Sequence, residues 1–571
     1  CNVYSGLKIG WSFNMSIAAA LLSYAFWQLA HYLFKTPYWD LLENNINQTA
    51  ASSAASIISA GIVAPIPALA ILTGRELSWA ILSIWCFVVS FTGVVVAVGL
   101  RKQMLINDKL PFPAGMATAE TVREIYAKGS EAFERVRVLV GSAILSGSIK
   151  LYSEFVAAVP KLPLSSLLPV GSASTRLGFV LDPSLLMIGF GGIIGLRAGL
   201  SLLFGTIVSW GLIGPWVLSK GWVHQAAGES SSYLFGTLVE WLLWPGVSMM
   251  VVAAITSFVL KVFFNKSKVN SDGDDEEEAE KSPAQLWPEY FALPEKEREV
   301  PRSWFWGGLV LAAIMATIAQ VWLFGISPLI AILAVLLTFV LAIVSCRVSG
   351  ETGIPPIGAL GKVTQLTFGI LNPGNLTANL MTANVTGGAA GQSSDLLHDM
   401  KTGLVIGATP RFQVIAQLFG IMAGALAGSA AYLILIPEPA KQLLTDKWPA
   451  PAVATWKAIA EVFKNGPEAI PTGSIPAMAI GALIGLAMSI LEWKLPKRYS
   501  DYLPSPASFG LAFIIPAWNS ISMFIGALLA YAFANSKPKV ATKYLMVIAA
   551  GLVAGESLAG IFAAIAGFLG F

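Results

Sequence analysis

Long apolar runs dominate this sequence and limit what it can fold into. Clear examples are Met15–Phe34, Trp79–Leu100 and Trp306–Val344. A helix needs about 20 apolar residues to cross a bilayer, so the first two runs fit one span each and the third is long enough for two. The sequence therefore predicts an all-α, polytopic membrane protein with about 14 to 16 transmembrane helices, several of them broken or re-entrant.

The composition narrows the class further. Only 12% of the residues are charged, against about 25% in soluble domains. The net charge of +3 is small and spread out, so nothing indicates nucleic acid as a partner. Cys1, Cys86 and Cys346 are scattered without a Cys-x-x-Cys pair, which disfavours a disulfide framework or a zinc site. We expect no cofactor and no bound metal. Because the chain opens without Met or a basic flank, we expect its numbering to start inside a truncated first helix.

One hydrophilic segment divides the chain. Residues 265–302 contain the acidic run Asp272–Glu278, a composition typical of a soluble, flexible linker. We expect 1–264 to form an N-terminal transmembrane half and 303–571 a C-terminal one. Seven Lys or Arg residues lie in 101–137 and seven in 261–302, so both segments are expected on the cytoplasmic side.

Three motifs of the first half recur in the second half in the same order. The matching pairs are Ile46–Ser56 with Ala383–Ser393, Leu110–Ala132 with Trp448–Ala469, and Asp182–Gly205 with Leu503–Gly526. One match could arise by chance in so biased a composition, but three ordered matches predict two tandem duplicated halves. Secondary transporters commonly bind their substrates where such repeats meet, often on interrupted helices.

The stretch from Asn372 to Lys401 is unusually polar for so apolar a chain. Asn372 and Pro373 predict a helix start, as N-cap and first helical residue. Two polar faces follow at helical spacing, Asn375, Asn379, Thr382 and Thr386 and then Gln392, Asp395 and Asp399. The glycine- and alanine-rich residues 387–391 between them can unwind or pack closely. A weaker polar face in the first half consists of Asn45, Thr49, Ser52 and Ser56.

Two interpretations of these polar residues compete. A polar group within lipid needs a hydrogen-bonding partner or a water-filled cavity. Taken singly, each Asn or Thr is better explained as a packing contact between membrane helices. Taken together, residues 372–401 favour a path for a substrate or an ion. His398 fits a helix-end residue and a proton relay equally well.

Three isolated carboxylates outside this stretch are further candidates for proton coupling or gating. Glu556 and Glu240 lie within strongly apolar sequence, and Glu351 opens a Gly- and Pro-rich segment that predicts a helix break. Carboxyl groups in such surroundings suit proton uptake and release. A structural hydrogen bond would explain each of them as well.

The motifs resemble those of a known family. Glu351–Gly420 resembles the core signature of the oligopeptide transporter superfamily, in the branch shared by bacterial members and plant yellow stripe-like proteins. Further similar segments are Asn2–Trp11, Glu43–Ser56, Leu110–Glu120 and Gly551–Gly560. The resemblance covers nearly the whole chain. It implies a duplicated helical fold, a homodimer, and secondary, usually proton-coupled uptake of short oligopeptides, peptide-like compounds or metal-chelate (siderophore) complexes.

Our leading hypothesis is a proton-coupled importer in the cell (inner or plasma) membrane, and not an enzyme. The residues expected to bind substrate between the halves are Asn47, Thr49, Asn375, Asn379, Asn384, Thr386 and Gln392. The residues expected to couple protons or gate are Asp395, His398, Asp399, Glu240, Glu351 and Glu556. One alternative is a passive channel. Another is an intramembrane aspartyl hydrolase that uses Asp395 and Asp399. The motifs do not distinguish a peptide from a metal chelate.

Overall fold

The structure, a computed structural model, describes most of the chain. The described residues are 1–10, 15–127, 129–157, 159–166, 173–223, 233–260, 283–353, 355–466, 470–500 and 502–568. This part is helical apart from one short antiparallel pair, β1 (Leu162–Pro163) with β2 (Val180–Leu181), in which Leu162 lies opposite Leu181. The all-α class predicted from the sequence is therefore confirmed.

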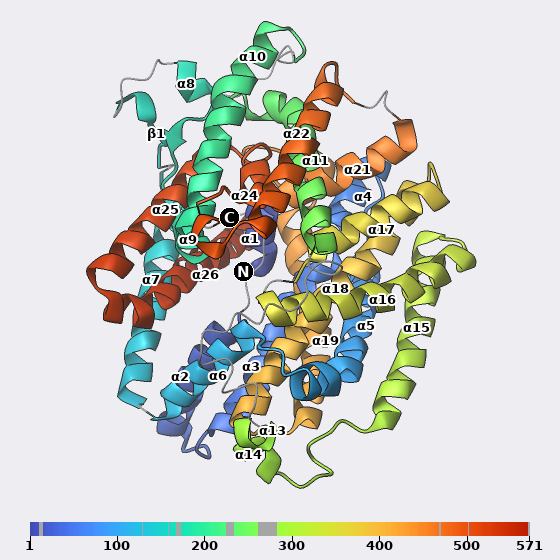
Figure 1. Cartoon of the computed structure of the whole chain (residues 1–571). Coiled ribbons are helices and arrows are strands. Elements are labelled where there is room, and N and C mark those ends of the chain that lie inside the picture. The colour runs from blue at the N-terminus through green and yellow to red at the C-terminus, as the bar shows by residue number, and fades with distance from the viewer. Residues whose placement is uncertain are drawn as a thin grey trace.

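The helices follow one another along the chain as Figure 1 labels them. Before the hydrophilic segment they are α1 (Asn2–Ile9), α2 (Ser16–Phe34), α3 (Leu41–Ala55), η1 (Ser56–Ala60), α4 (Pro65–Thr73), α5 (Trp79–Arg101), η2 (Lys102–Asn107), α6 (Pro113–Ala127), α7 (Gly129–Phe155), η3 (Leu164–Ser166), α8 (Ala173–Arg176), α9 (Leu185–Thr206), η4 (Ile207–Ile213), α10 (Gly214–Ser219) and α11 (Phe235–Val259). After it they are α13 (Pro283–Leu286), α14 (Pro288–Ala292), α15 (Arg302–Phe324), α16 (Pro328–Thr352), α17 (Ile357–Leu371), α18 (Leu376–Ile406), α19 (Pro410–Leu435), α20 (Pro439–Gln442), α21 (Pro451–Asn465), α22 (Ser474–Lys494), α23 (Lys497–Ser500), α24 (Pro506–Leu511), α25 (Ala517–Ser536) and α26 (Pro538–Phe568).

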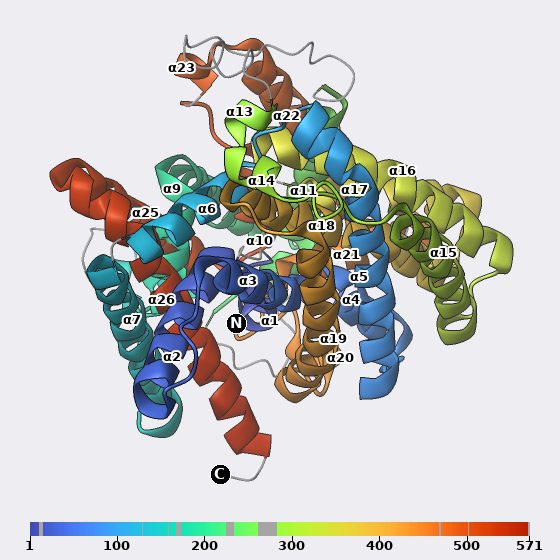
Figure 2. The same cartoon turned by 90° about the horizontal axis from the view of Figure 1, so that it is seen from below.

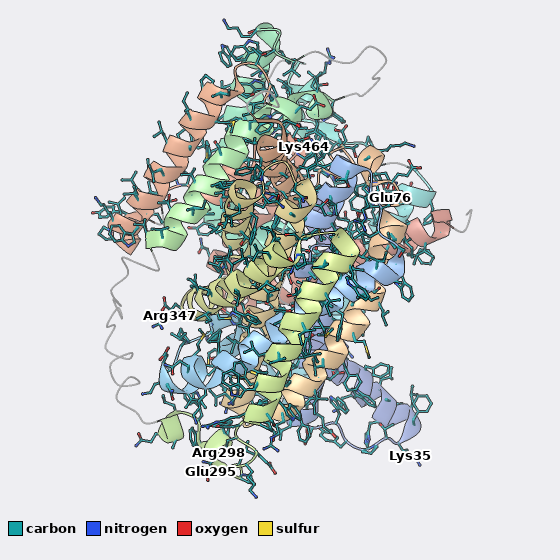
Figure 3. All side chains as sticks on the ribbon, turned by 90° about the vertical axis from the view of Figure 1, so that its right-hand side faces the viewer. Lys35, Glu76, Glu295, Arg298, Arg347 and Lys464 are labelled. Atoms are coloured by element: carbon teal, nitrogen blue, oxygen red, sulfur yellow. The ribbon has the colours of Figure 1, made fainter. Side chains whose placement is uncertain are left out.

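The outer surface is that of a membrane protein. Within the described residues, 11 helices are long and apolar enough to cross a bilayer, judged by length and composition. Large apolar side chains such as Trp322, Leu329 and Val340 are exposed on α15 and α16, where a soluble protein would carry charge. Figure 3 shows Lys35, Glu295 and Arg347 at the outer edge of the molecule. The chain is therefore a multi-pass membrane protein.

The helices group into two bundles that each mix the two halves of the sequence. In the α18 bundle, helices α3, α5 and α6 of the first half pack with α15, α16, α17, α18 and α19 of the second. In the α9 bundle, helices α7, α9 and α11 of the first half pack with α22, α24, α25 and α26. The blue and yellow helices of one bundle and the teal and red helices of the other lie side by side in Figures 1 and 2. The two halves are thus interleaved in space.

Helix α18 forms the axis of its bundle. All of its 31 residues are buried except Thr377 and Asp395, which are half-buried. The glycine- and alanine-rich residues 387–391 stay helical and allow close packing. A Cβ on Gly391 would lie 2.9 Å from the Cβ of Ser59 in η1. Of the two outcomes that this run allows, the structure shows close packing.

The predicted start of this helix is wrong by three residues. Asn372 is the C-cap of α17, and the N-cap of α18 is Asn375, whose side chain accepts from the Ala378 N–H. Gly374 has a positive φ of 82°, so the chain turns between the two helices before α18 begins. An Asn-Pro pair in the sequence does not show whether the Asn starts a new helix or ends the preceding one. Pro is common both at the first position of a helix and in the turn after one.

Several spans are interrupted, as the sequence predicted. The first half breaks after α3, where η1 ends at Gly61 with a φ of 107° before α4 starts. Helix α9 is kinked at Gly195, with a φ of 80° and a ψ of 171°. Helix α16 ends one residue after Glu351, at Gly353 with a φ of 77°, which confirms the predicted helix break. Glycine adopts these left-handed conformations without steric cost.

Two matched segments have unusual backbones in common. Phe112 precedes the first residue of α6, and Ala450 precedes the first residue of α21, in sequences that were paired as a repeat. Their φ angles are 44° and 43°, values that side chains other than glycine rarely adopt. Each also donates its N–H to a distant carbonyl, that of Gly350 or Leu7. These similarities are what a duplicated unit predicts, and the duplication stays a prediction.

The hydrophilic segment is only partly as expected. Its acidic run, Asp272–Glu278, lies outside the described residues. The following part is only partly solvated, because Trp287 and Tyr290 are buried against helix ends while residues such as Glu295 and Lys296 are exposed. Arg101 of α5 lies over the Tyr290 ring at 5.2 Å, and its guanidinium donates to the Arg298 carbonyl at 3.2 Å. The two basic segments therefore meet at one end of the molecule, as one shared cytoplasmic side requires.

Candidate functional site

Asp399 is the most enclosed carboxylate of the polar helix. Its side chain is 1% exposed, and its Oδ1 accepts hydrogen bonds from Gln48 Nε2 of α3 at 2.6 Å and from Ser16 Oγ of α2 at 3.1 Å. Ser16 Oγ also lies 3.0 Å from Ser52 Oγ. The side-chain hydrogen-bonding partners of Asp399 therefore come from first-half helices more than 340 residues away in sequence.

Asp395 lies one turn earlier on the same face of α18. Its Oδ2 accepts from Ser56 Oγ, at the start of η1, at 2.6 Å. Within the described residues, neither Asp395 nor Asp399 forms an ion pair. A buried carboxylate without a cation is costly as an anion, so neutral donors and a proton are the means of holding it in place.

Several buried polar atoms beside these carboxyls have no hydrogen-bonding partner among the described residues. They are Asp399 Oδ2, Gln48 Oε1, Gln392 Oε1 and both side-chain polar atoms of Asn45 and Gln417. Such atoms are rare in folded proteins, because each costs about 1–3 kcal/mol of desolvation. Their concentration between α3, α18 and α19 makes this region the candidate site.

His398 and Lys401 lie on α18 at one end of its polar face. This end is the one nearer to the basic segments. His398 Nε2 lies 3.0 Å from Ser349 Oγ of α16, and its ring packs edge-on against Phe112 at 5.1 Å. The Lys401 ammonium donates to the Leu110 carbonyl at 3.0 Å and lies 4.6 Å from the Trp287 ring. These contacts tie α18 to the loop before α6 and to the docked hydrophilic segment.

Other predicted residues of α18 make structural contacts in this conformation. Asn384 Oδ1 accepts from Trp85 Nε1 of α5 at 2.7 Å, and Thr386 Oγ1 lies 2.9 Å from Thr338 Oγ1 of α16. Asn379 Nδ2 donates to the backbone carbonyl of Gln365 in α17 at 2.7 Å, and Gln365 Nε2 donates to Asn379 Oδ1 at 3.0 Å. These side chains point to three different neighbouring helices, so they do not line one common cavity here.

Three more of the predicted substrate residues are also dispersed. Asn47 is half-buried and donates to Ser23 of α2 at 2.7 Å, on the far side of α3 from α18. Thr49 is buried and donates to the Asn45 carbonyl at 2.9 Å. Gln392 Nε2 lies 3.5 Å from Ser53 Oγ, so this residue does connect α18 with α3.

Asn375 has a local role that can be tested. Its side chain is exposed and caps α18 through a 2.9 Å bond from Ala378 N. Replacing Asn375 with Ala should lower the free energy of unfolding by about 1 kcal/mol, while Asn375→Ser should retain most of it. Thermal unfolding in detergent measures this. Uptake per folded molecule should not change if capping is its whole role, and reduced uptake would return Asn375 to the substrate site.

The three isolated carboxylates lie apart from Asp395 and Asp399. Glu240 is exposed on α11, and Glu351 is an exposed partner of Arg347 at 3.4 Å. Glu556 is 8% exposed on α26 and accepts from Ser184 Oγ and from the Leu186 N–H at the start of α9, at 2.8–3.1 Å. Only Glu556 therefore has the enclosed setting that the sequence predicted.

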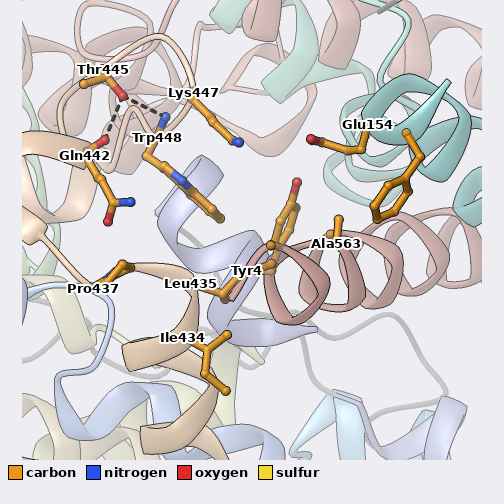
Figure 4. Close-up of a pocket in the computed structure, with 14 residues that line it drawn as sticks. Tyr4, Glu154, Ile434, Leu435, Pro437, Gln442, Thr445, Lys447, Trp448 and Ala563 are labelled. Carbon is orange, nitrogen blue, oxygen red and sulfur yellow. Dashed lines mark hydrogen bonds between the residues drawn. The ribbon is translucent and has the colours of Figure 1, made fainter. Parts of the chain in front are cut away.

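A pocket of about 660 Å³ lies at the ends of α7, α19 and α26. Glu154 and Lys447 point toward one another across it, with the Tyr4 hydroxyl between them (Figure 4). None of the predicted site residues lines it. Glu154 forms an ion pair with Lys150, one helical turn earlier on α7, at 2.7 Å. Among the described residues, no group of three or more His, Cys, Asp or Glu side chains could hold a metal ion.

The sequence analysis missed several residues of the polar core. Gln48 and Ser16 reach Asp399 directly, and Gln413 Nε2 of α19 donates to its backbone oxygen at 2.7 Å. Asn45, Gln48, Ser52 and Ser56 follow a spacing of 3, 4 and 4 residues, so helical periodicity could have found Gln48. Nothing in the sequence joins Ser16 or Gln413 to this group.

Known proteins resemble this chain along its length. The sequence model described as OPT oligopeptide transporter protein matches residues 1–566. A Saccharomyces cerevisiae protein, YGL114W, whose name refers to oligopeptide transport, is 26% identical over 99% of this chain and 93% of its own. A Haemophilus influenzae protein with a similar name is 26% identical over 98% and 92%. The metal-nicotianamine transporter YSL2 of Oryza sativa is 24% identical over 83% and 71%.

Proposed function

The chain belongs to the OPT oligopeptide transporter family, and from that premise we propose that it imports its substrate together with protons. The family consists of transporters, so the chain is a transporter and not an enzyme. This removes the alternative of an intramembrane hydrolase at Asp395 and Asp399. A passive channel remains the competing hypothesis for the transport step.

The observation that carries the proposal is the setting of Asp399. This carboxyl is buried on the central helix, forms no ion pair with a described residue, and is held by Gln48 and Ser16 from the first half. A proton on the carboxyl would remove the cost of a buried charge, and its loss would favour a conformation that opens the site to water. Asp395 extends the site by one turn, and His398 provides a second proton-binding group toward the basic segments.

The proposed substrate is a short peptide or a metal chelate. Support comes from the names of the relatives, which refer to oligopeptides in two of them and to metal-nicotianamine in the third. Residues between the bundles would contact this substrate in the open conformation. Gln392, Asn379 and Asn384 are candidates because they are buried polar side chains of α18 that bond to neighbouring helices in this conformation.

Uptake into proteoliposomes tests the coupling. With an acidic exterior, the protein should accumulate trialanine or the nickel–nicotianamine complex above its equilibrium concentration, and a protonophore should abolish the accumulation. Substrate addition should also acidify the vesicle interior. Uptake that only equilibrates the substrate, whatever the proton gradient, would identify a passive channel and end the proposal.

Three broader features complete the proposal. The protein would lie in the plasma membrane, or the inner membrane of a bacterium, where an external proton gradient is available. It would act as a homodimer, as the family resemblance implies. Its sequence halves, 1–264 and 303–571, would derive from one duplicated unit joined by residues 265–302. Mass photometry of the detergent-solubilised protein tests the dimer.

A further inference from the structure

The pocket of about 660 Å³ lies where the two bundles meet. One wall belongs to the α18 bundle and consists of the end of α19, with Leu435, and the segment that follows it, with Trp448. The other wall belongs to the α9 bundle and consists of the ends of α7, with Glu154, and of α26, with Gly560. Between the walls lies Tyr4 of α1, a short helix that contacts both α19 and α26 (Figure 4). A ligand in this pocket would therefore contact both bundles.

The pocket lies at the end of the molecule opposite to the basic segments. Near the start of α19, Arg411 donates to the Glu299 carbonyl at 3.1 Å, whereas the last residues of α19 line the pocket. Its 26 residues span about 39 Å, which exceeds the thickness of a bilayer core. Helices α7 and α26 run the same way, because Tyr544 near the start of α26 donates to Glu134 near the start of α7 at 2.8 Å. With the basic segments on the cytoplasmic side, the pocket would face the exterior, where an importer meets its substrate.

Two opposite charges face each other across this pocket. Figure 4 shows the Glu154 carboxylate and the Lys447 ammonium pointing toward one another, with the Tyr4 hydroxyl between them. Among the described residues, neither the Lys447 ammonium nor the Tyr4 hydroxyl has a hydrogen-bonding partner. Glu154 uses its Oε1 toward Lys150, and its second oxygen has no partner in the same part of the chain. Three polar groups with free hydrogen-bonding capacity therefore converge on one cavity.

The aromatic side chains of the pocket are held in place by their neighbours. The rings of Tyr4 and Trp448 pack edge-on with 5.1 Å between their centroids. A Cβ on Gly560 would lie 2.4 Å from the Tyr4 ring, so α26 packs directly against it. The Lys8 ammonium lies 5.3 Å from the centroid of the Trp448 ring and forms no ion pair with a described residue. Lys8 and Lys447 together give this side of the pocket an excess of positive charge, which favours a carboxylate.

Opposite charges that the fold holds apart are satisfied by a ligand that carries both. We propose that this pocket binds a short peptide in its zwitterionic form. The Lys447 ammonium and the Tyr4 hydroxyl bind its C-terminal carboxylate, and Glu154 binds its N-terminal ammonium. Apolar side chains such as Ile434 and Ala563 line the same pocket and would contact the side chains of the peptide. The volume is within the range of about 300–1,000 Å³ that is typical of small-molecule sites.

This inference deepens the proposed function and rests on it for the transport of the ligand. It also separates the two proposed classes of substrate. A free peptide has an ammonium group and a carboxylate group at its ends, whereas the amines of a metal chelate are bound to the metal. A chelate would therefore contact Lys447 without a need for Glu154. Because Glu154 faces the same pocket, the arrangement favours the peptide.

Calorimetric titration of the full chain in lipid nanodiscs tests the site with three peptides. Trialanine carries both end charges, its C-terminal amide lacks the carboxylate, and N-acetyl-trialanine lacks the ammonium. The amide should bind about tenfold more weakly than trialanine, as expected for the loss of a hydrogen bond between charged groups. N-acetyl-trialanine should bind about threefold more weakly, because Glu154 is already paired with Lys150 and contributes less.

Two variants should reproduce these losses from the side of the protein. Lys447→Gln should weaken the binding of trialanine about tenfold and leave the binding of the amide unchanged. Glu154→Gln should weaken the binding of trialanine about threefold without weakening that of N-acetyl-trialanine. A merely structural effect would weaken all three peptides alike. Lys441→Gln removes an exposed lysine of the same segment that does not line the pocket, and it should leave all affinities unchanged.

The outcomes against this site are distinct from those against the proposed function. Absence of trialanine binding to the wild type, or equal affinities of the wild type for the three peptides, would overturn the site. Binding of nickel–nicotianamine that depends on Lys447 but not on Glu154, without binding of trialanine, would overturn the peptide as its ligand. Peptide binding that depends on both residues without acid-driven uptake would contradict only the proton coupling. Acid-driven uptake that both variants leave intact would contradict only the pocket.

Discussion

Replacing Asp399 with Asn should abolish acid-driven accumulation of the substrate while the protein stays folded. Asn has the same shape and keeps an oxygen that can accept from Gln48 and Ser16, so the packing of α18 should persist. It cannot bind and release a proton, however. Coupling free energies of about 1–3 kcal/mol correspond to changes of about 5- to 150-fold. We therefore expect the accumulation ratio of the variant to be lower than that of the wild type by a factor within this range.

Two transport measurements on the same vesicles separate coupling from binding. Accumulation under a proton gradient should be lost in Asp399→Asn, but exchange of labelled for unlabelled substrate without a gradient should continue. Glu438→Gln, which changes an exposed carboxylate paired with Lys441, should behave as the wild type in both. If Asp399→Asn accumulated substrate normally while Asp395→Asn did not, the coupling group would be Asp395, and Asp399 would have a structural role.

The second large effect concerns the packing of the α9 bundle. Gly526 of α25 lies against the backbone of α9, where a Cβ would overlap the Ile188 carbonyl oxygen. Because backbone cannot rotate away as a side chain can, Gly526→Leu should force α9 and α25 apart. We expect a loss of about 3 kcal/mol in the free energy of unfolding, at the upper end of typical overpacking costs, and a clear drop in melting temperature.

A glycine in an open place is the matched control for this prediction. Gly307 of α15 has nothing within 4 Å of a Cβ, so Gly307→Leu should leave the melting temperature unchanged or raise it slightly, since Leu favours a helix. Equal melting temperatures for Gly526→Leu and the wild type would show that α9 and α25 are not in the close contact described here.

The class of fold was readable from the sequence because hydropathy acts locally. Runs such as Trp306–Val344 form the helices α15 and α16, with the break at the C-cap Gly325 and the N-cap Ser327. The polar character of α18 was also predicted, since Asp395 and Asp399 are four residues apart in one helix. What could not be predicted was which residues meet them, because Ser16 and Gln48 reach Asp399 only through the packing of α2, α3 and α18.

Two errors have instructive causes. The helix start at Asn372 was wrong because a capping signal and a terminating signal use the same residue types, and only the turn at Gly374 distinguishes them. Residues 283–302 were expected to be solvated, because the prediction extended the disorder typical of the adjacent acidic run to the whole segment. Trp287 and Tyr290, which are buried, are the aromatic residues that such a segment lacks when it is truly unfolded.

The docked residues 287–299 have a mechanical consequence. They contact four helices of the α18 bundle at one end of the molecule, through Arg101 of α5, Arg123 of α6, Lys401 of α18 and Arg411 of α19. A clasp of this kind prevents those helix ends from sliding past one another, so the α18 bundle should move as a rigid body. Any alternation between outward and inward access would then be a displacement of the α9 bundle, whose helix α11 packs on α17 and α21, with the clasp as its fixed reference.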